Sequence, residues 1–439
     1  MTSRRTAIKQ VLGTAAAFAV PNLWRHDLPY DLPYDRPYLE VARQAATWIG
    51  HARQTTPHGA VWPVDPLVPS VVDTESLYSG TPGVVLFLLE LHRATGDTSA
   101  LRDAMAGADH LIGTLATKEL GLYVGLGGIA YVFELVHRAS GQARYRDATK
   151  RCVAAIGDAT SDGKTWGASN DIISGIAGSG LALLWLADQV PELRTQALNL
   201  ANRAGNALME RAQTTAAGLQ WQAGLDIPYL LPNFSHGTAG VAYFLASLHQ
   251  RQPNPRALAA ATAGGRELLS IATTANETCT IYHDDRVAGR TLYYLGWCHG
   301  PVGTTRLFSR LGWEKWVHRG ARGIMLSGIP EQRTPGFWNN ISMCCGNAGV
   351  AQFFAEMGRA YANPSYRQFA HRVTVDLLQR GTTDATGTRW FQAENRVDPN
   401  GVVAQTGYMQ GAAGVGTMLL HLDGLTQGRA PFVTLPDAV

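Results

Sequence analysis

Seven times along the chain, a glycine pair of the form Gly-x-x-Gly is followed directly by a run of apolar residues. After the pair at Gly80 and Gly83, for example, the sequence continues Val-Val-Leu-Phe-Leu-Leu. A helix without a polar face must be buried on every side, so each run predicts an inner helix. The seven pairs begin at Gly80, Gly125, Gly175, Gly237, Gly300, Gly346 and Gly411.

Segments with one apolar and one polar face lie between the glycine motifs. In residues 142–160, Tyr145 and Cys152 fall on one stripe at helical spacing, whereas Lys150 lies off it. Outer and inner helices therefore alternate, and seven repeats of this kind predict an all-α fold, a closed α/α toroid of seven helical hairpins similar in architecture to six-hairpin glycosidases. The other outer helices are expected at 38–54, 98–116, 192–214, 254–274, 314–328 and 364–381.

The glycines have a steric function in this interpretation. They open each inner helix where neighbouring backbones crowd together and no side chain fits. If every motif begins an inner helix, the residues just before the glycines gather at one end of the barrel. Reactive side chains that are far apart in the sequence are therefore expected to meet there.

The first 19 residues have the pattern of a secretory signal. A charged start with Arg4, Arg5 and Lys9 precedes a short apolar stretch that ends in Ala17-Phe18-Ala19. The paired arginines resemble a twin-arginine signal, which predicts that the twin-arginine export machinery delivers a folded protein to the periplasm or the exterior. An amphipathic N-terminal helix is the alternative.

Three tandem tetrapeptides follow the predicted signal and begin at Asp27, Asp31 and Asp35. A proline in every fourth position forbids a helix and favours an extended chain. We therefore expect a linker over residues 20–37 and the barrel over residues 38–435.

Composition and charge narrow the function further. Apolar residues make up 46% of the chain and charged residues 16%, which suits a large buried core and argues against disorder. The net charge of +3 arises from the three basic residues of the predicted signal, so the rest of the chain is balanced and does not favour nucleic-acid binding. No stretch of about 20 consecutive apolar residues is present, so we expect no stable membrane anchor.

Three of the five cysteines lie directly before glycine motifs. Cys298 precedes Gly300, and the adjacent pair Cys344 and Cys345 precedes Gly346. Thiolates are preferred ligands of zinc, a helix N-terminus lowers the pKa of a thiol, and three protein ligands leave one tetrahedral position open. A buried apolar role for Cys298, or a disulfide between the adjacent cysteines, is the alternative.

Trp297-Cys298-His299-Gly300 and Cys344-Cys345-Gly346-Asn347 resemble the zinc motifs of the lanthionine synthetase C (LanC) family. The Cys-Cys-Gly form is similar to that of the cyclase domain in class II lanthipeptide synthetases, where three cysteines hold Zn²⁺. Other members of the family carry Cys-His-Gly, so Cys345 takes the place of their histidine ligand. The resemblance extends over all seven repeats, about residues 38–425.

The same resemblance implies three further site residues. His236, in Phe-Ser-His-Gly-Thr-Ala-Gly, matches the motif of the active-site histidine, and Asp171 matches that of the active-site aspartate. A lone histidine is more often structural, and an aspartate before a helix is more often an N-cap, but the barrel prediction brings both to the rim with the cysteines. His299 occupies a position where relatives place a residue that assists proton transfer.

The sequence departs from the family pattern four residues before the first zinc cysteine. Relatives commonly carry an arginine there, and this chain has Tyr294, with Arg290 as a candidate substitute. A polar cluster over residues 283–286 is a further candidate ligand set, although a solvated loop is the commoner origin of such a cluster.

The resemblance implies a zinc-dependent enzyme that adds a thiol to a dehydroalanine or dehydrobutyrine and so forms a thioether. A peptide or a small thiol is the expected substrate, and a monomer is expected. A glycan-active barrel would instead use paired carboxylates among aromatic side chains, and no second acid is evident beside Asp171. A non-catalytic, zinc-stabilised scaffold that binds a peptide is the other alternative.

Overall fold

Two concentric rings of helices form the molecule. The computed structural model describes residues 36–438 except 74, 118 and 162–165, and this part contains fourteen α-helices. The inner ring consists of α3 (Thr81–Thr95), α5 (Leu126–Ser140), α7 (Ile176–Gln189), α9 (Thr238–Arg251), α11 (Pro301–Arg310), α13 (Asn347–Ala360) and α15 (Ala412–Thr426). The outer ring consists of α2 (Pro37–His51), α4 (Thr98–Thr114), α6 (Ala143–Ala159), α8 (Arg194–Glu210), α10 (Pro255–Ser270), α12 (Glu314–Met325) and α14 (Pro364–Arg380).

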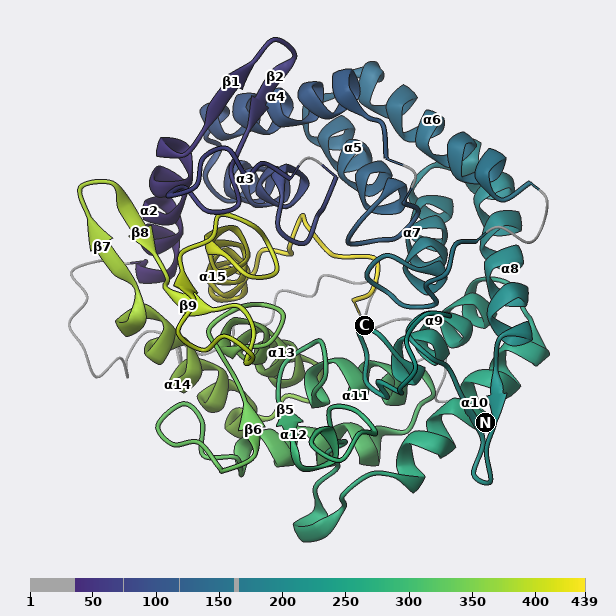
Figure 1. The fold of residues 1–439 in the computed structure, drawn as a ribbon. Helices are drawn as coiled ribbons and strands as arrows, with labels where there is room; N and C mark the ends of the chain where they lie inside the picture. The colour runs from purple at the N-terminus through teal and green to yellow at the C-terminus, as the bar shows by residue number, and fades with distance from the viewer. Residues whose placement is uncertain (1–35, 74, 118, 162–165, 439) are drawn as a thin grey trace.

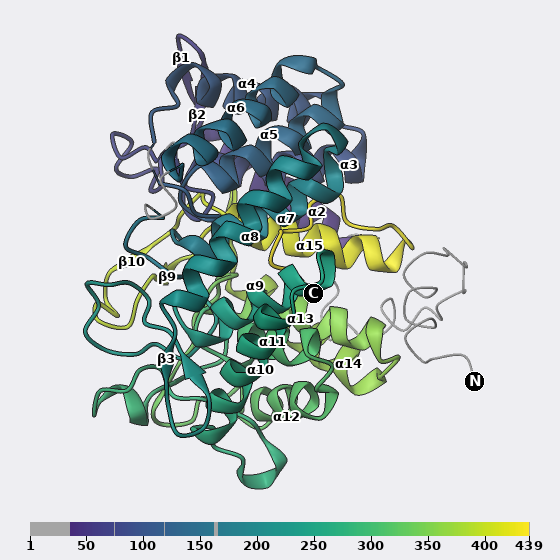
Figure 2. The same ribbon diagram turned by 90° about the vertical axis from the view of Figure 1, so that its right-hand side faces the viewer.

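Figure 1 shows the inner helices around a central axis with the outer helices surrounding them, and Figure 2 shows the ring from the side. This arrangement confirms the predicted α/α toroid of seven hairpins. The predicted signal and nearly all of the predicted linker lie outside the described residues, so both remain predictions.

Short strands lie in the connections that lead from outer to inner helices. They form five two-stranded pairs, four antiparallel and one parallel. The strands are β1 (Gln54–Thr56), β2 (Gly59–Val61), β3 (Gln213–Thr214), β4 (Leu219–Gln220), β5 (Tyr293–Tyr294), β6 (Phe337–Trp338), β7 (Thr382–Asp384), β8 (Gly387–Arg389), β9 (Gln392–Ala393) and β10 (Val402–Val403).

The glycine motifs begin the inner helices, as the sequence predicts. The first glycine of each motif is the N-cap of an inner helix. A Cβ atom on the second glycine would collide with the carbonyl oxygen of the residue six positions earlier; at Gly240 the separation from the Phe234 oxygen would be 2.1 Å. Only glycine permits this approach of two backbones.

The seven connections are joined to one another by a closed ring of backbone hydrogen bonds. In each connection, a residue two or three positions before the first glycine donates its N–H to the carbonyl of the corresponding residue in the next connection, at distances of 2.8–3.2 Å. Buried backbone N–H and C=O groups need hydrogen-bond partners. The ring supplies these partners where side chains leave no room for water. The residues are Tyr78, Tyr123, Ile173 with Ile172, Ser235, Cys298, Cys344 and Met409, whose N–H returns to Tyr78.

The first and last helices close the toroid. Helix α15 packs against α3 and α13 in the inner ring, and α2 packs against α15 from outside. Arg36 at the start of α2 forms an ion pair with the buried Asp423 of α15. The ring is therefore complete only when both ends of the helical region are in place.

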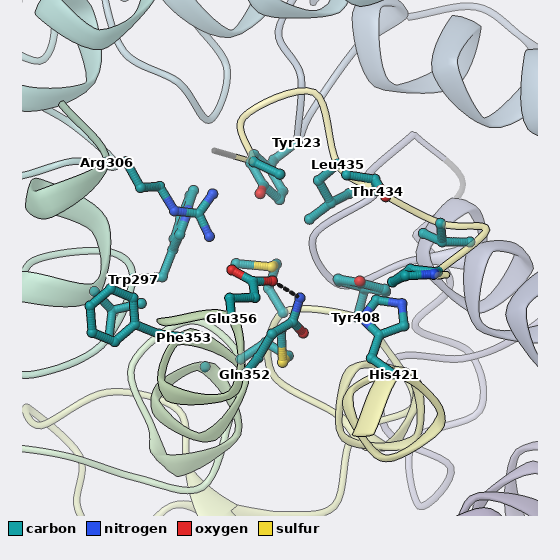
Figure 3. Close-up of a pocket in the computed structure, with 17 residues that line it drawn as sticks. Tyr123, Trp297, Arg306, Gln352, Phe353, Glu356, Tyr408, His421, Thr434 and Leu435 are labelled. Atoms are coloured by element: carbon teal, nitrogen blue, oxygen red, sulfur yellow. Dashed lines mark hydrogen bonds between the residues drawn. The ribbon is translucent and has the colours of Figure 1, made fainter. Parts of the chain in front are cut away.

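The C-terminal segment enters the space enclosed by the inner helices. The carboxylate of the fully buried Asp437 accepts hydrogen bonds from the Tyr123 hydroxyl and the Trp297 indole and pairs with Arg306 at 3.1 Å. Beside this segment lies a cavity of about 60 Å³, and Figure 3 shows Arg306, Glu356 and the C-terminal residues around it. The segment thus fills the lumen beneath the connections.

No described helix is both long and apolar enough to cross a membrane.

Replacing Asp437 with alanine is expected to destabilise the fold by about 3–5 kcal/mol, because the change leaves the Arg306 charge buried without a partner. Urea denaturation measures the change in the free energy of unfolding. The matched control is Asp188→Ala, which breaks the partly exposed Arg251–Asp188 pair and should cost less than about 1 kcal/mol. Equal losses in the two variants would contradict the anchoring role of Asp437.

Candidate metal centre and adjoining pocket

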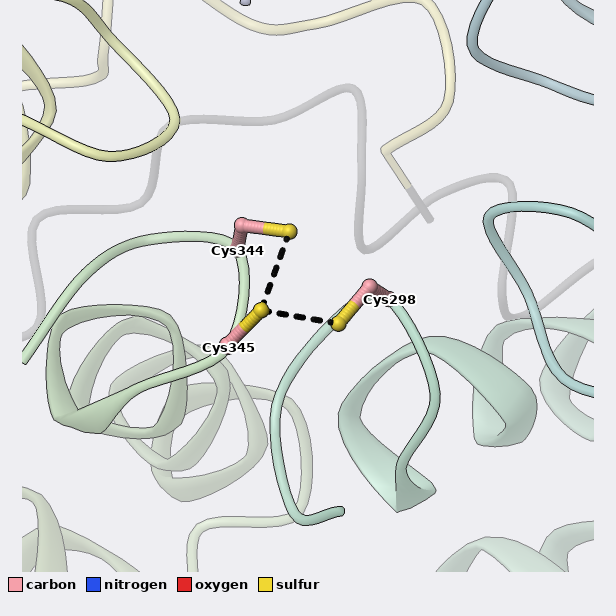
Figure 4. Close-up of side chains that lie close together, drawn as sticks. All are labelled: Cys298, Cys344 and Cys345. Carbon is pink, nitrogen blue, oxygen red and sulfur yellow. Dashed lines mark hydrogen bonds between the residues drawn. The ribbon is translucent and has the colours of Figure 1, made fainter. Parts of the chain in front are cut away.

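Three cysteine sulfurs converge from two neighbouring connections. The Sγ atom of Cys345 lies 3.2 Å from that of Cys298 and 3.5 Å from that of Cys344, and all three sulfurs lie within 4.8 Å of one another (Figure 4). Cys298 precedes α11, whereas Cys344 and Cys345 precede α13. Their positions, one or two residues before the first glycine of a motif, bring them together. The structure therefore unites the three predicted ligands into a cluster able to hold a metal ion.

No disulfide joins the clustered cysteines. All five cysteines of the chain are free and buried. Burial raises the pKa of the Cys298 and Cys344 thiols, whereas hydrogen bonds from these two thiols lower the pKa of Cys345. Cys152 and Cys279 lie outside the cluster, and burial raises the pKa of each thiol to about 12.

A pocket of about 360 Å³ opens onto the three sulfurs. It lies at the end of the barrel where the inner helices begin, since its walls come from the connections that precede them. The volume falls within the range of small-molecule sites. The wall includes Cys298, Cys344, Cys345, His236, His299, Tyr78, Tyr294, Glu394 and Gln410.

His236 and Asp171 form a hydrogen-bonded pair at the edge of this pocket. The Nδ1 atom of His236 lies 2.5 Å from Oδ2 of Asp171, which is buried, whereas the His236 side chain is 36% exposed. The other carboxylate oxygen of Asp171 accepts the N–H groups of Ser174 and Gly175 before α7. Asp171 is thus a histidine partner that also holds the turn before α7, whereas the N-cap of that helix is Gly175.

His299 is buried between two other histidines. Its ring centroid lies 5.7 Å from that of His236 and 4.3 Å from that of His283. Burial lowers the pKa of His299 well below its usual value, and the neighbouring His283 and His236 act in the same direction. The structure therefore places His299 against the pocket as an imidazole that favours its neutral form.

The polar cluster over residues 283–286 lies in a loop that turns two of its side chains inward. Asp284 is fully buried, accepts two hydrogen bonds from the Arg286 guanidinium and lies 2.6 Å from Nδ1 of His283. His283 in turn packs against Tyr294 and His299, whereas Arg286 is exposed. The loop expected from the sequence is therefore present, and it is solvated at Arg286 but buried at Asp284.

Arg290 does not replace the arginine that is missing at position 294. Its Nε atom donates to the backbone oxygen of Asp285, the residue is exposed, and it is absent from the pocket wall. Tyr294 itself lines the pocket. Burial, reinforced by Cys345 and Cys298, raises its pKa, and Arg396 acts in the opposite direction.

Two pocket residues escaped the sequence analysis. The Tyr78 hydroxyl donates to the Cys344 sulfur at 3.0 Å, and the Gln410 amide donates to the Tyr78 hydroxyl at 2.8 Å. Tyr78 stands two positions before its glycine, as Cys298 and Cys344 do, and Gln410 stands one position before its glycine, as His236 and Cys345 do. The repeat register was the signal that could have identified both.

The fold and the site define a class of protein: a helical toroid with a three-thiol cluster able to hold a metal ion at one end and a histidine–aspartate pair beside it. Comparison with known families agrees with this description. The family described as lanthionine synthetase C-like protein matches residues 71–435, and the chain belongs to this family.

Solved structures support the same fold. Nisin cyclase is similar over 90% of this chain and 94% of its own, with a TM-score of 0.63 and 16% sequence identity. The α-1,6-mannanase GH76A of Salegentibacter sp. HEL1_6 is similar over 89% of this chain and 99% of its own, with a TM-score of 0.48 and 12% identity. The first of these likenesses establishes a shared toroid; the second is too low to support an inference.

One curated protein matches over a short stretch. The 3-oxo-tetronate kinase of Pseudomonas savastanoi pv. phaseolicola is 32% identical over 142 residues, which is 32% of this chain and 30% of that protein. The chain thus spans less than a third of the curated relative that it matches.

Proposed function

We propose that this protein is a zinc-dependent enzyme that adds a thiol to a dehydroalanine or dehydrobutyrine residue and so forms a thioether. The observation that carries the proposal is the cluster of three buried cysteine sulfurs at a pocket that also holds the His236–Asp171 pair. Family membership supports the same conclusion. The finer assignment, from the metal to the reaction, is ours.

The donor set fits zinc. Three sulfur ligands within 4.8 Å of one another match the preference of this ion for thiolates, and three protein ligands leave one position toward the pocket. Cys298, Cys344 and Cys345 would hold the ion. When bound, zinc supplies a Lewis acid that lowers the pKa of a substrate thiol, so that thiolate is present near neutral pH.

The remaining chemistry needs a proton at a defined carbon. A carbon–sulfur bond forms at the β-carbon of the alkene, the π electrons move toward the α-carbon and its carbonyl, and the resulting enolate takes a proton at the α-carbon. His236 faces the pocket, and an imidazole can carry this proton near working pH. Asp171 holds its Nδ1 atom and so leaves Nε2 for the substrate.

His299 has a different role in this proposal. Its imidazole is buried and favours the neutral form, so we assign it to orienting the substrate and assisting proton transfer rather than to carrying charge. His283 packs against it and fixes the ring.

Exposed apolar side chains at the pocket end of the barrel, a set that we call the apolar rim, favour a peptide as the substrate. Of the ten large apolar side chains that are exposed among the described residues, nine lie in connections that lead to inner helices, at the pocket end of the barrel. An exposed apolar rim is typical of a surface that binds a chain. The nine are Leu67, Val68, Val71, Leu225, Val287, Leu326, Phe391, Val397 and Val402.

We also propose that the protein works outside the cytoplasm as a monomer. The twin-arginine pattern of residues 3–9 supports export in the folded state, which allows zinc to be loaded before the cysteines meet an oxidising compartment. The proposed reaction starts from a residue that is already dehydrated, so a separate dehydration reaction must supply it.

Purified wild-type protein is expected to contain a single zinc ion per chain, and Cys298→Ala and Cys344→Ala are expected to lose most of it, because each removes a ligand. Elemental analysis by mass spectrometry measures the content. Cys152→Ala, a buried cysteine of α6, is the control and should retain zinc. Equal zinc in all four proteins would remove the metal assignment.

His236→Ala is expected to lower the rate of thiol addition by about 10²–10⁴-fold while zinc content stays unchanged, since the residue donates a proton and holds no metal. Single-turnover mass spectrometry of a dehydroalanine peptide measures the rate. His51→Ala, an exposed residue of α2, is the control. Zinc-loaded wild-type protein that adds thiol to no dehydro-peptide would favour a binding scaffold instead.

Leu67→Asp and Val397→Asp are each expected to lower kcat/KM for a peptide by about tenfold, because an apolar contact is lost. The rate with a small thiol and a dehydroalanine amino acid should stay the same. The control is Leu258→Asp, an exposed residue on α10 away from the rim. If peptide and small substrate suffer equally, the rim does not bind the substrate.

A further inference from the structure

A chain of hydrogen bonds reaches the metal centre from the last connection of the barrel. It runs from Gln392 to Gln410, then to Tyr78, and ends at the sulfur of Cys344. The successive distances are 3.0, 2.8 and 3.0 Å. Gln392, Gln410 and Cys344 are buried, and Tyr78 is partly buried on the pocket wall.

Backbone groups at its start fix the direction of this chain. The N–H of Ile341 can only donate, and it donates to the side chain of Gln392 at 3.2 Å, so the atom facing it is the amide oxygen. The amide nitrogen of Gln392 therefore faces Gln410, where it donates to the backbone carbonyl and to Oε1. This network assigns the orientation of both amides.

The orientation of the Gln410 amide then fixes the donor and acceptor roles of the Tyr78 hydroxyl. Because Oε1 of Gln410 accepts from Gln392, its Nε2 faces the Tyr78 hydroxyl and donates to it. The hydroxyl has a single proton, and the sulfur of Cys344 receives it. Cys344 is thus held as an acceptor, the state in which a cysteine binds a metal ion.

We propose that Tyr78, oriented by Gln410 and Gln392, is a positioning residue of the metal centre that aims and stabilises the Cys344 sulfur as a ligand. This inference rests on the metal site of the proposed function and adds residues from the first and last connections to it.

The negative charge of the bound metal site would give the hydrogen bonds from Tyr78 and Gln410 a function. Three thiolates around a divalent ion carry a net negative charge, and a substrate thiolate adds to it. No lysine or arginine is among the described residues that line the pocket. The Tyr78 hydroxyl and the Gln410 amide, which also lies 3.9 Å from the Cys345 sulfur, supply the positive ends of dipoles instead. Partners of this kind orient metal ligands and tune the metal.

Titration of metal-free protein with Co²⁺ tests the proposal without measuring activity. Tyr78→Phe is expected to weaken metal binding by about 10- to 100-fold. It should also shift the sulfur-to-cobalt charge-transfer band to longer wavelength, because a sulfur without its hydrogen bond gives up an electron more easily. Gln410→Leu, which keeps Tyr78 but removes the group that orients it, should change both quantities in the same direction by less.

Tyr131→Phe is the matched control. Tyr131 is also buried, but its hydroxyl donates to the backbone of Thr434, away from the sulfurs. The control should leave affinity and band unchanged. An unchanged metal affinity and charge-transfer band in Tyr78→Phe, or an equal loss of affinity in Tyr131→Phe, would overturn the positioning role of Tyr78 while leaving the proposed function intact. Failure of the wild-type protein to give a thiolate–cobalt band would instead refute the metal site itself.

Discussion

The closed ring of backbone hydrogen bonds between the seven connections is the constraint on which the rest of the molecule depends. Each connection must bring its backbone against the next one, and only glycine leaves room for that at the start of each inner helix. Once the ring is closed, most of the side chains one and two positions before the glycines face a common pocket. The chemistry of the site is therefore decided by which residues occupy these positions, and the helices serve to hold them in register.

This constraint separates two kinds of site residue. Cys298 and Cys344 stand at ring positions, and Cys345 and His236 directly follow ring residues, so the repeat alone brings them together. Asp171 lies farther from its glycine and reaches the site only through His236, to which it is bonded while it also caps the backbone before α7. The metal centre thus follows from the repeat, whereas the histidine–aspartate pair depends on a local turn.

The helical repeat was predictable because its two signals, glycine pairs and fully apolar runs, recur in every hairpin. The three sulfur ligands were predictable because they stand one or two positions before those glycines. Tyr78 followed the same rule and was missed, since a tyrosine does not stand out in a sequence as a metal-site residue. The burial of His283 and Asp284 could not be predicted, because consecutive polar residues have the same pattern in an exposed loop. Their partners Arg286, Tyr294 and His299 meet them only through the path that one connection takes in space.

The hydrogen bond between Tyr78 and Gln410 has a consequence for folding during protein synthesis. One residue precedes the first inner helix and the other precedes the last, and the contact between α2 and α15 closes the same gap. On the ribosome, early hairpins emerge and stack while the final one is still unmade. The cysteine cluster can gain its full set of neighbours only after α15 has left the exit tunnel, so metal capture in its finished surroundings must wait for the last hairpin.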